Sequence, residues 1–158
     1  MLVKLKNVRI NFAALFEPTV SPKFPKNDPK FQITLLLDKK KDAEKISTVA
    51  KALDEVAAGK RLDKHPLVDG DGEGQHEANA GLYTVKATSK RRPVVVGKDG
   101  EALTAEDGVI YDGCYCDVAL DVYYYADMKG AFATLLGVKF VKDGEPLGRR
   151  VYSTEDMF

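Results

Sequence analysis

The amino-acid sequence predicts a mainly β domain, a small barrel or sandwich with one amphipathic helix and long loops. Five segments alternate apolar and polar side chains with the period of two that is typical of strands, whereas the segment 42–59 carries apolar side chains at helical spacing. An α/β fold would need several helices to connect parallel strands, so that class is excluded. The 158 residues suit one domain at 1–148, and the polar segment 149–158 is expected to be a flexible tail.

The first predicted strand begins near residue 3 and contains a shift in its alternation. Apolar side chains stand at odd positions up to Leu5 and at even positions from Val8 to Phe12, so the parity changes at Asn7. One inserted residue in a strand produces such a change, and we therefore expect a β-bulge at this point.

The other predicted elements follow from periodicity, proline and glycine. Four prolines within residues 17–30 indicate an extended loop. The helix is expected to begin after the N-cap Asp42 and to stop at Gly59, before a long polar loop at 60–81. The remaining predicted elements are strands at 31–37, 82–89, 113–125 and 131–141, a short edge strand at 93–96 and a hairpin turn at 127–130.

The two cysteines, Cys114 and Cys116, indicate a reducing compartment. In a strand they would point to the same face about 6.5 Å apart, which is an awkward span for a disulfide. We therefore expect free core thiols in a cytoplasmic protein. No apolar run approaches the ~20 residues of a membrane-spanning helix, and the first residues lack the apolar centre of a signal peptide, so no membrane association is expected.

The net charge gives no evidence for nucleic-acid binding, because 24 basic and 24 acidic residues cancel. Their distribution is uneven, however. The first strand carries Lys4 and Lys6, and residues 86–98 hold five basic side chains and no acidic one. A neutral chain with this distribution is expected to fold with a basic face.

Two patterns of metal-binding residues are weak. The acidic loop 69–74 matches the first positions of a calcium-binding loop, but Ala80 stands where such a loop needs a bidentate glutamate. Asp112, Asp127 and Lys129 loosely resemble the carboxylates and lysine of a magnesium-dependent nuclease, although turn formation explains the latter two better. We expect a protein that is not an enzyme, with no catalytic residue, metal or cofactor; a magnesium-dependent nuclease is the alternative.

An aromatic and basic surface is the strongest functional signal. Tyrosines project from the polar face of the strand 113–125, and cations belong to or follow the strand 82–89, which we expect to be its neighbour. Rings that stack on bases and cations that neutralise phosphates are what sequence-tolerant single-strand binding requires. A protein-interaction surface with tyrosine hot spots is an open alternative. The predicted DNA-binding residues are Lys4, Lys6, Lys86, Lys90, Arg91, Arg92, Tyr111, Tyr115, Tyr123 and Tyr125.

Four stretches of the chain match the pattern of a known family. They are residues 6–18, 108–115, 136–145 and the closing Glu155-Asp156-Met157-Phe158. In this order they resemble the opening strand, the central segment, the last strand and the acidic, Phe-terminated tail of phage single-stranded-DNA-binding proteins with an oligonucleotide/oligosaccharide-binding (OB) barrel. The resemblance implies a five-stranded OB-like barrel that protects and extends single-stranded DNA during phage replication and recombination in the host cytoplasm.

The resemblance also implies partners and raises a question of topology. Glu155, Asp156 and Phe158 would bind replication or recombination proteins, and a homodimer is compatible with the same family. Single-stranded RNA is a second candidate ligand, because stacking does not depend on the 2′-hydroxyl. A standard OB barrel places its helix between the third and fourth strands, whereas here it follows the second. Either a strand is hidden within residues 11–30 or the barrel is a variant.

Overall fold

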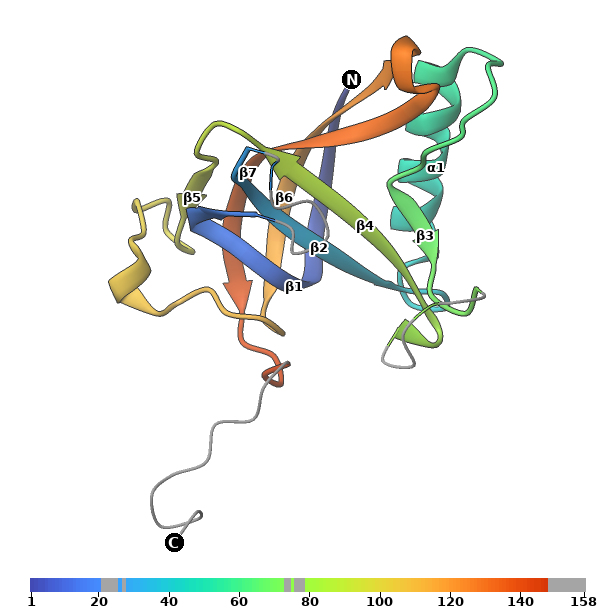
Figure 1. Ribbon diagram of the computed structural model, residues 1–158. Helices are drawn as coiled ribbons and strands as arrows, with labels where there is room; N and C mark the ends of the chain where they lie inside the picture. Colours follow the sequence, from blue (N-terminus) through green and yellow to red (C-terminus); the bar gives the residue numbers. More distant parts are fainter. Residues whose placement is uncertain (21–25, 27, 73–74, 76–78, 148–158) are drawn as a thin grey trace, which may run out of the picture.

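The computed structural model describes residues 1–20, 26, 28–72, 75 and 79–147, and shows a β-barrel with a helix beside it (Figure 1). The sequence predicted most of these elements but neither the short strand inside the polar loop nor the continuation of the first strand to residue 19. The elements are β1 (Leu2–Thr19), β2 (Lys30–Asp38), α1 (Ala43–Ala57), β3 (Leu67–Asp69), β4 (Leu82–Ser89), β5 (Val94–Val96), η2 (Ala105–Asp107), β6 (Tyr115–Tyr125), η3 (Ala126–Met128) and β7 (Gly130–Lys142).

Five strands close the barrel in the order β1-β2-β4-β7-β6, and β6 returns to β1. The neighbouring pairs are antiparallel except β4 and β7, which are parallel and joined by one residue pair, Thr88 with Thr134. β3 adds to β4 and β5 adds to β7 outside this ring. The predicted five-stranded barrel is confirmed. Because α1 lies between β2 and β4 and the ring closes without a further strand, the barrel is the variant form.

Two bulges allow β1 to serve two neighbours. Its first half pairs with β6 with one register shift, and its second half pairs with β2 with two shifts; the bulges lie at the shift between Leu5 and Val8 and at the shift between Asn11 and Ala14. Asn7 and Phe12 lie at these shifts with left-handed φ angles of 53° and 49°. The bulge expected at Asn7 is confirmed, and the one at Phe12 was not predicted.

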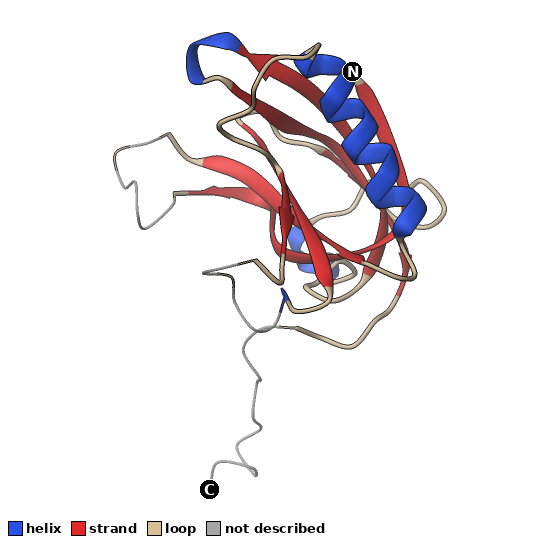
Figure 2. Ribbon diagram, turned by 90° about the vertical axis from the view of Figure 1, so that its right-hand side faces the viewer, coloured by secondary structure: helices blue, strands red, loops and turns tan. Residues whose placement is uncertain are grey.

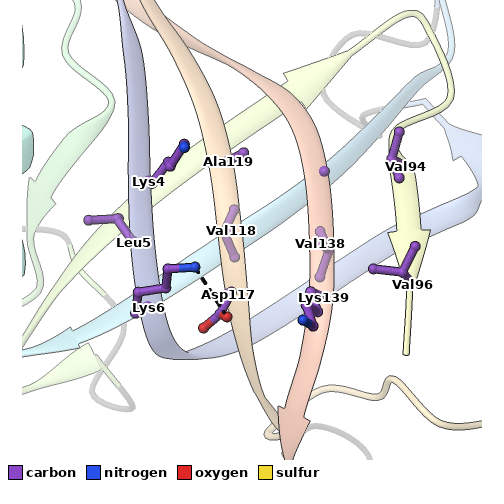
Figure 3. Close-up of a pocket in the computed structure, with 11 residues that line it drawn as sticks. Lys4, Leu5, Lys6, Val94, Val96, Asp117, Val118, Ala119, Val138 and Lys139 are labelled. Carbon is purple, nitrogen blue, oxygen red and sulfur yellow. Dashed lines mark ion pairs between the residues drawn. The ribbon is translucent and has the colours of Figure 1, made fainter. Parts of the chain in front are cut away.

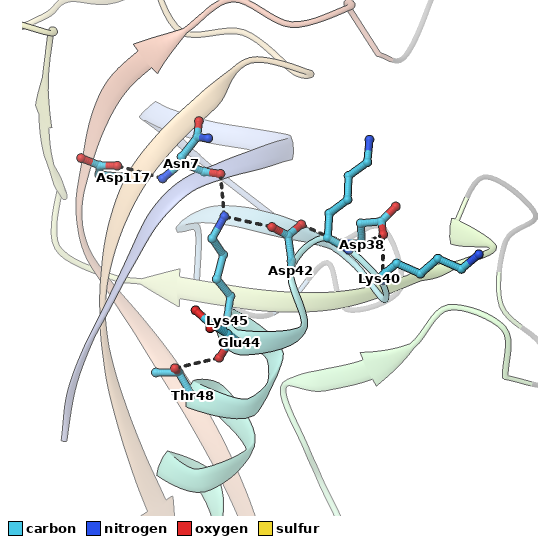
Figure 4. Close-up of polar contacts among 9 residues, drawn as sticks. Asn7, Asp38, Lys40, Asp42, Glu44, Lys45, Thr48 and Asp117 are labelled. Carbon is cyan, nitrogen blue, oxygen red and sulfur yellow. Dashed lines mark hydrogen bonds and ion pairs between the residues drawn. The ribbon is translucent and has the colours of Figure 1, made fainter.

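A chain of polar contacts fixes the first bulge to α1 (Figure 4). The Asn7 amide donates to Asp117 Oδ1 at 2.9 Å, and Lys45 Nζ donates to the Asn7 carbonyl at 3.1 Å. Lys45 also pairs with Asp42, whose carboxylate accepts from the Asp38 amide at 2.9 Å rather than from an amide of the helix. Asp42 therefore stands at the expected N-cap position but ties the helix to β2 instead.

The apolar face of α1 closes the core from the side of β1 and β6 (Figure 2). Val49 and Leu53 are fully buried there, as their helical spacing predicted. The alternation of β6 is also confirmed, since Cys114 and Cys116 are free and fully buried. Their Sγ atoms lie 3.7 Å apart, and the shared hydrogen bond together with burial raises the pKa of the Cys116 thiol.

The aspartates of the predicted polar loop have a structural role. Lys39 Nζ lies 2.6 Å from Asp69 Oδ1 and 2.7 Å from Asp71 Oδ2, and it stands over the ring of Tyr83 at 5.2 Å. Hydrogen bonds from Lys39 hold the pKa of both carboxyls below the ordinary value and raise the pKa of the lysine. In the described part of the chain, no three side chains of His, Cys, Asp or Glu form a metal-binding group.

Candidate nucleic-acid interface

A groove of about 670 Å³ opens where β4, the segment 64–68 and the hairpin of β6 and β7 meet. Figure 1 shows this hairpin extending beyond the barrel beside α1. The groove includes three kinds of side chain: aromatic, basic and small apolar or hydroxyl-bearing. They belong to Lys30, Lys64, His65, Pro66, Val68, Lys86, Thr88, Tyr123, Tyr125, Met128, Ala131, Phe132 and Ala133.

The aromatic side of the groove comes from the alternation of β6. Val122 points into the core, so Tyr123 and Tyr125 project outward, and their side chains are 40% and 46% exposed. Tyr123 pairs across the hairpin with Phe132, and the two ring centroids lie 6.0 Å apart with a tilt of 34°. This contact orients the Tyr123 ring and leaves part of its surface free for a ligand. The predicted outward position of both tyrosines is confirmed.

The opposite side of the groove is held against the hairpin by backbone hydrogen bonds. Ala131 N donates to the Lys64 carbonyl at 3.0 Å, and Asp63 N donates to the Lys129 carbonyl at 2.6 Å. Gly130 permits this approach, because a Cβ at that position would lie 2.8 Å from the Cβ of Lys64. His65 Nδ1 donates to the Leu67 carbonyl at 2.7 Å, because a carbonyl oxygen can only accept.

The charge of the groove is of one sign. Lys30 begins β2, Lys86 lies on the outer face of β4 and Lys64 belongs to the opposite side. Among the residues that the structure describes, none of those lining the groove is Asp or Glu. Lysines positioned around exposed tyrosines can neutralise a phosphate backbone while its bases stack on the rings. The faces of β2 and β4 together with the loop between β6 and β7 are also the surface that OB folds use for oligonucleotides.

Comparison with known proteins identifies the family of this chain. The sequence model of the family described as "Enterobacter phage Enc34, ssDNA-binding protein" matches residues 1–158. The chain belongs to this family. Protein p50 of Acyrthosiphon pisum secondary endosymbiont phage 1 is 34% identical to it over 173 residues, which cover 99% of this chain and 92% of that protein.

Solved structures of other phage proteins are similar in fold to this Enc34 family member. The single-stranded DNA-binding protein of bacteriophage Enc34, solved in complex with ssDNA, is similar with a TM-score of 0.75 and 26% identity over 93% of this chain and 89% of that chain. The fold also resembles gp2.5, a single-stranded DNA-binding protein of bacteriophage T7, with a TM-score of 0.55 and 18% identity over 97% of this chain and 98% of that chain.

The residues predicted as one DNA-binding surface do not all lie together in this Enc34 family member. Lys86, Tyr123 and Tyr125 share the groove described above, which we call the aromatic groove. The expectation that β4 neighbours β6 is wrong, because β7 lies between them in the barrel. Lys86 and Tyr123 line one groove all the same, because the hairpin carries the end of β6 beyond the barrel.

Lys4 and Lys6 line a second groove on another face of the barrel (Figure 3). This groove measures about 280 Å³ and lies over β1, β6, β7 and β5, with Lys139 and Val94 among its other residues. Lys6 Nζ lies 3.6 Å from Asp117 Oδ2, so part of its charge is compensated within the protein.

Tyr115 and Tyr111 lie towards the other end of the barrel. Tyr115 begins β6, ~26 Å along the strand from Tyr123, and Lys142 Nζ stands 4.8 Å from its ring centroid. The Tyr111 hydroxyl donates towards the Gly144 carbonyl at 2.9 Å and accepts from the Gly144 amide at 3.0 Å. Burial raises the pKa of this hydroxyl. Tyr111 therefore fastens the turn that follows β7.

Two of the three cations that follow β4 have partners of their own. Lys90 Nζ lies 3.3 Å from Asp28 Oδ2, and Arg92 donates to the Phe16 carbonyl at 3.2 Å. The backbone amide of Arg91 donates to Ser89 Oγ at 3.1 Å. These residues continue the strand that carries Lys86 and lie outside the aromatic groove.

The carboxylates of the nuclease alternative are separated. Asp112 precedes β6 and Asp127 follows it, so the 11 residues of that strand, ~35 Å in length, stand between them. Asp112 Oδ1 instead accepts from the Ala13 amide at 2.9 Å. Glu155, Asp156 and Phe158 lie outside the described residues. Within the part of the chain that the structure describes, no helix is long and apolar enough to span a membrane.

Sequence reasoning missed Lys30, Lys64, His65 and Phe132 as groove residues. The position of Phe132 was available from the hairpin, since a turn at 127–130 places it opposite Tyr123. Lys64 carries no comparable signal, because it reaches the groove through a backbone approach to Gly130 that is distant in the chain.

Proposed function

We propose that this protein binds single-stranded DNA in the groove between β4, the segment 64–68 and the β6–β7 hairpin. Bases stack on Tyr123 and Tyr125, and phosphates lie against Lys30, Lys64 and Lys86. The observation that supports the proposal is the presence of two outward tyrosines and only basic charge in one groove of a member of an ssDNA-binding protein family. Stacking accepts every base, so we expect little sequence preference.

The biological role that follows is one of a carrier rather than a catalyst. Bound in this groove, unwound DNA is kept extended and shielded from nucleases during phage replication and recombination. Single-stranded RNA is a weaker candidate for the same groove, since the rings do not read the 2′-hydroxyl.

Fluorescence anisotropy with labelled single-stranded and duplex oligonucleotides tests the proposal, each with and without magnesium. We expect tight binding of the single strand, weak binding of the duplex and affinity that falls steeply with salt. Equal affinity for the duplex would contradict it. Cleavage that depends on magnesium would support the nuclease alternative, and no binding of either strand would favour the protein-interaction surface.

The acidic end of the chain has a proposed role of its own. Glu155, Asp156 and Phe158 form an end segment that fits recognition by a basic pocket with an apolar floor on a replication or recombination protein. Deletion of residues 155–158 is expected to leave folding intact and DNA affinity unchanged or modestly higher at low salt, while association with the partner is lost. A deletion that lowers DNA affinity and retains every partner would overturn this role.

A further inference from the structure

Phe12 occupies an unfavourable backbone conformation and an unfavourable environment at once. Its φ is 49°, in the left-handed region that bulky side chains rarely adopt, and its side chain is 61% exposed. The bulge itself is held by other groups, since Asn11 Oδ1 accepts from the Phe12 amide and Asp112 Oδ1 accepts from the Ala13 amide, both at 2.9 Å. Folding therefore requires a bulge here but does not require an aromatic ring.

The position of Phe12 relates it to the aromatic groove. Asn11, immediately before it, pairs with Thr34 of β2, and Thr34 pairs with Lys86 of β4, which lines the groove. Asn11, Thr34 and Lys86 share the outer face of the sheet, because their chain neighbours on the inner face are fully buried: Ile10, Leu35 and Val85. Two strand spacings, ~10 Å, separate β1 from β4 at this level.

A second row of paired residues also connects β1, across β2, with a groove residue of β4. Ala14 pairs with Gln32, and Gln32 pairs with Thr88, another residue of the groove. The two β2 residues on these rows are Gln32 and Thr34, uncharged polar side chains over which a nucleic-acid backbone can pass without repulsion. An exposed ring at the end of such a surface has the chemistry of a base-stacking platform.

We propose that Phe12 is a second stacking platform, on which a base of the bound strand lies after the strand leaves the aromatic groove and crosses β4 and β2. This inference rests on the proposed function of the groove and extends the contact surface from one side of the barrel face to the other. The added span of ~10 Å is compatible with the ~4–16 nucleotides that one OB fold covers.

The test separates stacking from a structural role with the variant Phe12→Gly. Glycine adopts the left-handed conformation without strain, so the bulge persists and the melting temperature is expected to stay the same or rise. Affinity is measured by anisotropy for oligothymidines of increasing length. For long oligonucleotides we expect a loss of about 5- to 150-fold, and for the shortest one that the groove holds we expect no change. Phe12→Trp keeps an aromatic ring at this position, so it should bind oligonucleotides of every length with the affinity of the original protein.

Two further variants make the outcome decisive. Leu2→Ala removes an apolar side chain that is 58% exposed on the same strand, and it is expected to bind every length like the original protein. If Phe12→Gly binds oligonucleotides of all lengths normally while Tyr123→Ala binds them more weakly, the proposed stacking on Phe12 is wrong and the proposed binding in the aromatic groove is retained. If both bind normally, the proposed function itself fails. A loss that is equal at every length and accompanied by a lower melting temperature would assign Phe12 a structural role and overturn the inference.

Discussion

Replacement of Tyr123 by leucine should separate DNA binding from stability. Leucine retains an apolar contact with Phe132 but cannot stack on a base. Stacking on one ring contributes about 1–3 kcal/mol, so the dissociation constant for single-stranded DNA should rise by about 5- to 150-fold. The tilted ring pair at 6.0 Å contributes about 0.5–1.5 kcal/mol to folding, which corresponds to a melting temperature lower by about 1–6 °C in a domain of this size.

Tyr115→Leu is the matched control for this prediction. It removes a tyrosine of the same strand whose ring contacts Lys142, a cation–π pair of about 0.5–1 kcal/mol, so the loss of stability should be similar. Its ring lies outside the groove, and we expect DNA affinity to change little. Anisotropy at fixed salt and thermal melting are measured for both variants. An equal loss of affinity in the two, or an unchanged affinity for Tyr123→Leu, would refute the assignment of the groove.

Three further results are expected. Lys86→Gln should lower the slope of log affinity against log salt by ~0.7, the share of one phosphate contact on a single strand, and an unchanged slope would place the backbone elsewhere. Gly130→Ala should displace Lys64 and weaken DNA binding more than Gly137→Ala, a control at a half-buried position of the same strand. An added Cβ at Gly137 would come no closer than 3.3 Å to Val94, against 2.8 Å to Lys64 at Gly130, and equal affinities would contradict the close approach. Lys39→Met should be less stable than the original protein at neutral pH. Because Lys39 lowers the pKa of its two aspartate partners, its contribution is present above their ordinary value of 3.8 and is lost as the pH falls below it. Melting curves of the two proteins should therefore converge towards acid pH, and a constant difference would refute the ion pairs.

Local periodicity was sufficient to predict the helix, the buried faces and the barrel strands, apart from the second half of β1; it did not predict β3. The alternation around Cys114 and Cys116 places the same residues in the core as the structure does, and the parity change at Asn7 locates its bulge. The continuation of β1 to Thr19 was not predicted, because prolines and a second bulge mask the alternation and the pairing with β2 is what keeps the chain extended.

The candidate site could be predicted only in part, because it depends on the closure of the barrel. The sequence indicates which tyrosines face outward, but the neighbours of a strand are decided by long-range pairing. Tyr115 and Tyr123 share one face and still lie ~26 Å apart, so a shared face does not make a shared site. Lys64 enters the groove from a polar loop that carries no periodic signal.

The short pairing between β4 and β7 bears on how DNA binding would affect the stability of the closed barrel. One residue pair, Thr88 with Thr134, joins these strands, whereas eight pairs join β2 to β4. Thr88 lines the aromatic groove, with Lys86 on its own strand and Tyr123 on the hairpin across the joint. In the proposed complex, a strand of DNA that contacts both sides bridges the part of the ring with the fewest paired residues, where local opening is expected to cost least. Ligand that binds only the closed form stabilises it by mass action. Under the proposed function protection is mutual: the barrel shields the bound DNA, and the DNA keeps the barrel closed.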